Sequence, residues 1–161
     1  RVFAAIALPA DQRGSVVIPP RRDALRNRSL VWVPSLSRPS LDALRYAATV
    51  SDEVVAVWVR SDDEDLGPIR SDWQRLVGDS DAVSLRILES PYASLIDPFV
   101  DFVAAEEQAH PDVTHTIVMP MAIPRYRFDS LLLNQRGINM RRALDASGNR
   151  IYTLVRYYLP A

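Results

Sequence analysis

The chain has 161 residues, of which 48% are hydrophobic and 24% are charged, and its net charge is −1. This is the composition of one globular domain that is long enough to bury its own core. The absence of cysteine excludes a disulfide framework, a thiolate nucleophile and a cysteine zinc site, and the near-neutral charge argues against nonspecific binding of nucleic acid.

The first 28 residues differ in composition from the rest of the chain. Residues 1–28 contain paired prolines and then a basic stretch at 21–28, so we expect a linker or lead-in segment before a domain at 29–161. The basic stretch is either a solvated linker or a juxtamembrane segment close to anionic lipid headgroups. The chain begins with Arg1 rather than methionine, which favours a piece of a longer protein. No segment has the ~20 apolar residues that a transmembrane helix needs.

From residue 29 onward, strand-like and helix-like segments alternate. Apolar, mostly β-branched runs predict strands at residues 30–33, 54–59, 83–88, 116–119 and 151–159. Apolar residues at helical spacing predict helices at residues 40–51, 69–76, 95–109 and 128–146. We expect Pro120 to close the fourth strand, and Ser90 and Pro91 to begin the third helix as its N-cap and first residue.

This alternation predicts an α/β fold. Strands joined by helices need right-handed crossovers, which give a parallel sheet with helices on both faces. We expect a doubly wound five-stranded sheet in the order 3-2-1-4-5. Ligands of such sheets bind at the carboxyl ends of the strands where the order reverses, here between the first and fourth strands. The predicted ligand-binding loops are therefore residues 34–40 and 120–129.

No catalytic motif is present, and we expect neither an enzyme nor a cofactor. A P-loop requires a lysine, and the sequence has none. The loop after the first strand has no glycine for a dinucleotide fingerprint, and the nucleophile elbow G-x-S-x-G is absent. The chemistry of the chain is therefore expected to be binding.

We predict no metal site. His110 stands at a predicted helix end, where a positive charge or a donor complements the helix dipole, and His115 opens the fourth strand. A two-histidine metal site needs a carboxylate partner at a spacing that the sequence does not reveal, so structural or surface roles are expected. The acidic run at residues 62–65 lacks regular ligand spacing and is interpreted as a solvated loop.

The strongest polar feature follows the fourth strand, and it continues into the next predicted helix as far as Arg136. Two arginines and a tyrosine in a loop at the predicted switch point can grip a phosphate while the ring stacks on a base. The same residues are equally compatible with a surface loop and an exposed helix. The candidate nucleotide-binding residues are Pro34, Ser35, Ser37, Arg38, Arg125, Tyr126, Arg127, Asn134 and Gln135.

Three segments resemble the C-terminal cytosolic domain of bacterial APC-superfamily permeases. They read DALRYA at residues 42–47, ESPY and then SLI within residues 89–96, and PR, LL and NQ within residues 124–135. The permease group includes amino-acid-permease-like transporters and high-affinity potassium importers. The resemblance covers about residues 29–159.

The resemblance implies a fold similar to universal stress proteins and a homodimer below the transmembrane transporter domain of the same chain, at the cytoplasmic face of the cell membrane. In potassium importers it implies inhibition by bound cyclic di-AMP. Universal stress proteins that bind ATP have a glycine-rich loop after the fourth strand, and residues 120–129 contain no glycine, so tight ATP binding is not expected.

The expected function is therefore a homodimeric regulatory domain of an amino acid or potassium transporter that senses a nucleotide such as cyclic di-AMP. Apolar and aromatic positions on the last predicted strand support the dimer, because that strand is the expected sheet edge. The alternative is a stand-alone, universal-stress-like dimerisation or partner-binding protein without a nucleotide.

Overall fold

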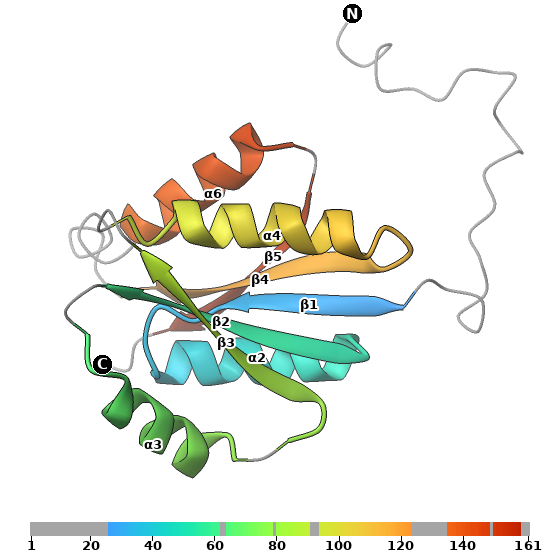
Figure 1. Ribbon diagram of the computed structural model, residues 1–161. Helices are drawn as coiled ribbons and strands as arrows, with labels where there is room; N and C mark the ends of the chain where they lie inside the picture. The colour runs from blue at the N-terminus through green and yellow to red at the C-terminus, as the bar shows by residue number, and fades with distance from the viewer. Residues whose placement is uncertain are drawn as a thin grey trace, which may run out of the picture.

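The computed structural model describes residues 26–61, 64–78, 80–90, 94–123, 135–148 and 150–158, in which strands and helices alternate (Figure 1). The strands are β1 (Asn27–Trp32), β2 (Glu53–Ser61), β3 (Val83–Ser90), β4 (Thr114–Ile123) and β5 (Ile151–Tyr158). The helices are α2 (Arg38–Val50), α3 (Leu66–Leu76), α4 (Asp97–Ala109) and α6 (Gln135–Ala146). Among these described helices, none has the length and apolar character needed to cross a membrane.

The five strands form one parallel sheet in the order β3-β2-β1-β4-β5. β1 is central, and its Leu30 is in register with Val55 of β2 and Ile117 of β4. Helices α4 and α6 cover one face of the sheet, and α2 and α3 cover the other (Figure 1). The predicted α/β class, the doubly wound architecture and the strand order 3-2-1-4-5 are all confirmed.

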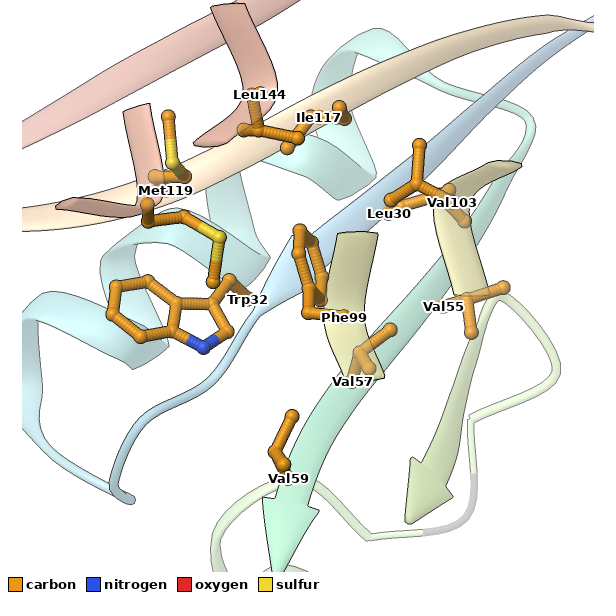
Figure 2. Packing of buried hydrophobic residues seen from close by; sticks show 11 residues of the cluster. Leu30, Trp32, Val55, Val57, Val59, Phe99, Val103, Ile117, Met119 and Leu144 are labelled. Carbon is orange, nitrogen blue, oxygen red and sulfur yellow. The ribbon is translucent and has the colours of Figure 1, made fainter. Parts of the chain in front are cut away.

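Two apolar cores lie on the two faces of this sheet, because successive side chains of a strand point to opposite faces. Beneath α4 and α6, Phe99 and Val103 pack on strand residues that include Leu30 and Trp32, as Figure 2 shows. On the opposite face, Val31 and its neighbours on the strands pack against α2 and α3. Leu30, Val31 and Trp32 of β1 are buried on both faces, and they form an uninterrupted apolar run after the polar residues that begin the strand.

The fourth strand is longer than predicted. Pro120 does not close β4 but lies within it, in register with Val155 of β5. The pairing of β1 with β4 ends at Val31 and Val118, so a proline two residues later does not interrupt that ladder. The three strand residues that follow Pro120 extend β4 past the end of β1.

The start of α4 also differs from the prediction. The expectation that Ser90 caps this helix is wrong: Ser90 is the last residue of β3, and its hydroxyl donates to the carbonyl of Ser94 over 2.6 Å. The helix begins at Asp97, with Pro98 in its first turn, where a missing backbone N–H leaves no helical hydrogen bond unmade. The predicted helix at 128–146 is observed from Gln135, and its earlier residues lie outside the described part.

The lead-in segment lies almost wholly outside the described residues, which begin at position 26. β1 begins at Asn27, and the side chain of Asn27 donates to the carbonyl of Val50 and to the hydroxyl of Ser51. These contacts attach the first described residues to the end of α2. The division of the chain at residue 28 stays a prediction.

Candidate ligand site at the carboxyl ends of β1 and β4

A cavity of about 240 Å³ lies where the strand order reverses. Parallel strands end there with β1 and β4 leading to opposite faces of the sheet, which opens a crevice between them. Both segments predicted to bind a ligand contribute to its wall, although residues 120–122 belong to the end of β4 rather than to a loop. The lining residues are Trp32, Pro34, Ser35, Ser37, Pro39, Ser40, Pro120, Met121, Ala122, Arg136 and Gly137.

The first turn of α2 forms one side of the cavity. Ser37 is the N-cap residue in an extended conformation, but its side chain makes no capping hydrogen bond. Its hydroxyl oxygen lies 3.3 Å from that of Ser40, which is fully buried. The positive end of the helix dipole therefore borders the hollow beside Ser37 and Ser40, an arrangement that suits an anion.

The first turn of α6 forms the other side. Arg136 is exposed to solvent and lines the cavity, together with Gly137. An arginine guanidinium binds a phosphate with two parallel hydrogen bonds, which gives orientation as well as attraction. A Cβ atom added at Gly137 would meet nothing within 4 Å, so the backbone is openly accessible at this point.

The remaining wall is apolar. Trp32 is 3% exposed and belongs to the core, whereas Pro34 and Met121 are partly exposed at the cavity. Small-molecule sites commonly combine such apolar surface with a few convergent polar groups. The described lining residues include no carboxylate and no histidine.

The structure brings some of the predicted site residues together. Pro34, Ser35 and Ser37 line the cavity. Gln135 is the first residue of α6 but is not part of the lining. The remaining candidates after the fourth strand lie outside the described residues: Arg125, Tyr126, Arg127 and Asn134.

Arg38 is directed elsewhere. It lines a neighbouring hollow with Leu41, Asp42, Arg45 and Tyr157. A hydrogen bond to the side chain of Tyr157 raises the pKa of the Arg38 guanidinium above its usual value. Arg38 therefore connects α2 to β5 on the flank of the cavity.

Sequence reasoning left Arg136 out of the predicted site, although it stands in the same polar run as Asn134 and Gln135. Met121, which lines the cavity, lies within the predicted ligand-binding segment 120–129 but was not among the candidate residues named from the sequence. Because the helix was predicted to begin at residue 128, Arg136 did not fall in its first turn, and the sequence offered no signal that placed it at the crevice.

The fold and the cavity define a doubly wound α/β domain with a hollow at the point where the strand order reverses. Residues 25–157 match the family described as the KimA potassium transporter C-terminal domain, and the chain belongs to that family. Over 135 residues the chain is 29% identical to the potassium transporter KimA of Bacillus subtilis (strain 168). This match covers 83% of the chain and 20% of the relative, so the chain spans about a fifth of the length of that protein. The resemblance to a permease C-terminal domain is thereby confirmed.

Proposed function

We propose that the chain is the cytoplasmic regulatory domain of a potassium transporter and that it senses a nucleotide such as cyclic di-AMP. The observation that carries the proposal is the cavity between β1 and β4, with Arg136 of α6 and the N-terminus of α2 at its wall. Membership of the potassium transporter family favours potassium over an amino acid as the transported solute.

The chemistry of the cavity favours a phosphodiester. Its described cationic group is Arg136, and its described hydroxyls come from Ser35, Ser37 and Ser40. A phosphodiester carries one negative charge and can accept hydrogen bonds from Arg136 and from the accessible serines, Ser35 and Ser37. Pro34 and the other apolar lining residues offer surface on which a base can lie.

A homodimer is part of the proposal, and the two sheet edges differ in a way that supports it. β5 exposes Ile151 to 59% and Tyr158 to 68%, with the exposed Arg156 between them. The opposite edge strand, β3, exposes the charged side chains of Arg86 and Glu89, a common protection against pairing. We therefore place the contact between copies at β5.

The binding proposal is tested by calorimetric titration of cyclic di-AMP into the chain and its variants. Arg136→Ala should weaken binding about ten- to a hundredfold, which corresponds to one lost charge-assisted hydrogen bond of about 1.5–3 kcal/mol. The matched control is Arg141→Ala on the same helix, because Arg141 lies outside the cavity lining and 3.8 Å from Asp145. Arg141→Ala should bind as the wild type does.

Other results would change the proposal. Titration of Arg125→Ala and Arg127→Ala tests the loop predicted from the sequence. If Arg125→Ala and Arg127→Ala bind cyclic di-AMP with the wild-type affinity while Arg136→Ala binds it more weakly, the site is confined to the cavity. The absence of binding by the wild type at high micromolar ligand would favour the alternative of a dimerisation domain without a nucleotide. In the full-length transporter, cyclic di-AMP should lower potassium uptake, and Arg136→Ala should relieve that inhibition.

A further inference from the structure

A second group of chemically capable side chains lies at the opposite end of the sheet, where β4 begins. Glu106 and His110 are one turn apart near the end of α4, and His115 is the second residue of β4. One side-chain ligand atom from each of these three residues lies within 4.8 Å of the other two. Glu106, His110 and His115 are called the α4–β4 cluster below.

His115 has a polar atom that the fold leaves unpaired. The residue is 9% exposed, and its Nε2 atom is buried without a hydrogen-bond partner. Buried polar atoms in native proteins have partners in most cases, and an exception calls for a cause such as a bound ion.

The other two members of the cluster already face a cation. Nη1 of Arg28 donates to Oε2 of Glu106 over 2.7 Å and lies 3.2 Å from Nδ1 of His110. A guanidinium can only donate, so Nδ1 of His110 is the acceptor in this contact. The lone pairs of the Glu106 carboxylate and of the His110 imidazole are therefore both directed at Nη1 of Arg28.

We propose that Glu106, His110 and His115 bind a divalent transition-metal ion such as Zn²⁺, which takes the place of Nη1 of Arg28. Imidazole nitrogen and carboxylate oxygen are ordinary zinc ligands, and water completes a four-coordinate site with three protein ligands. The guanidinium of Arg28 moves as one rigid plane, and it can keep Glu53 as its partner, because the Glu53 side chain that its Nε and Nη2 atoms contact at 3.0 and 2.9 Å is 42% exposed and free to follow.

Small movements of the side chains in the α4–β4 cluster would bring their ligand atoms to the distances that zinc requires. Tetrahedral zinc with bonds of about 2.0–2.2 Å needs ligand atoms roughly 3.3–3.6 Å apart. Nδ1 of His110 is already 3.5 Å from Oε2 of Glu106. The side chain of His110 is 41% exposed, so rotation of this ring can close the remaining distance to His115. Such an ion would join the end of α4 to the start of β4, at the end of the sheet opposite the cavity between β1 and β4.

The test is calorimetric titration of Zn²⁺ into the chain, prepared without an affinity tag and treated with a chelator beforehand. We expect one saturable site per chain. His110→Ala should weaken zinc binding by at least about tenfold. Even the loss of a residue that only orients a metal ligand weakens metal affinity about ten- to a hundredfold. Glu107→Gln is the matched control, because this neighbouring carboxylate pairs with Arg150 and is not in the cluster. The control should keep the wild-type affinity.

Two further measurements make the result decisive. Co²⁺ in place of Zn²⁺ should give the visible absorption of a four-coordinate ion, and His115→Gln should abolish it. Arg28→Gln should tighten zinc binding, because it removes the competing charge. The proposal is overturned if the wild type shows no saturable binding, if His110→Ala binds zinc as well as Glu107→Gln does, or if Arg28→Gln binds it more weakly.

Discussion

The Nε–H group of Arg150 lies 3.0 Å from both carboxylate oxygens of Glu107, and this ion pair joins α4 to the segment that enters β5. The side chain of Arg150 is only 9% exposed. Ion pairs shielded from water in this way are costly to break, because the remaining charge stays buried without a partner. The segment that enters the edge strand β5 is thereby attached to a helix that contacts β2 and β3 in the opposite half of the sheet.

Arg150→Gln is expected to lower the free energy of unfolding by about 1.5–3 kcal/mol, the contribution typical of hydrogen bonds to charged groups. The measurement is urea denaturation of the wild type and the variant. Arg75→Gln is the control, because the Arg75–Asp72 pair is 2.7 Å long but exposed, and such pairs contribute about 0–1 kcal/mol. Equal losses in the two variants would contradict the role assigned to Arg150.

Phe99→Ala should destabilise the domain by about 3–5 kcal/mol, because it removes a large side chain from a fully buried position beneath α4. Figure 2 shows Phe99 among the side chains of β1 and β2. Tyr46→Ala on α2 is the comparison, since Tyr46 is 38% exposed and should cost much less. Denaturation curves that shift by the same amount would place Phe99 outside the core.

Two glycine substitutions should act in opposite directions. Gly78 has a φ of +72° directly after α3, so Gly78→Ala should cost about 1–2 kcal/mol. Gly137 lies inside α6, and an added Cβ there meets nothing within 4 Å. Gly137→Ala should therefore stabilise the domain by about 0.5–1 kcal/mol through helix propensity. Thermal unfolding of both variants checks the signs, and a gain in stability for Gly78→Ala would contradict the assigned backbone.

The proposed β5 contact predicts a dimer mass in light scattering at micromolar concentration. The double variant Ile151→Lys and Tyr158→Lys places charge on the exposed apolar positions of this edge and should give the monomer mass. Ser84→Lys makes the same change on the other edge strand, β3, and should stay dimeric. A dimer that survives the double variant would move the interface away from β5.

The sequence predicted the order of elements well and their ends less well. β1 and β2 are apolar on both faces, and this pattern is visible in one dimension. Strand and helix ends depend on which neighbour is present, as β4 illustrates: Pro120 is tolerated because β1 has already ended. Likewise, Ser90 has the residue type of a helix cap, but its hydroxyl found a partner in Ser94 within the connection that precedes α4.

By itself, the sequence determined the parallel α/β sheet, its order and the crevice between the first and fourth strands. Those properties follow from alternating periodicities and from the handedness of crossovers, which are local or general rules. Only the tertiary structure decided which side chains meet. It turned Arg38 toward Tyr157 and placed Arg136 at the cavity. It also set His115 beside Glu106 and His110. These side-chain contacts depend on the packing of one element on another, which the spacing of residues along the chain does not encode.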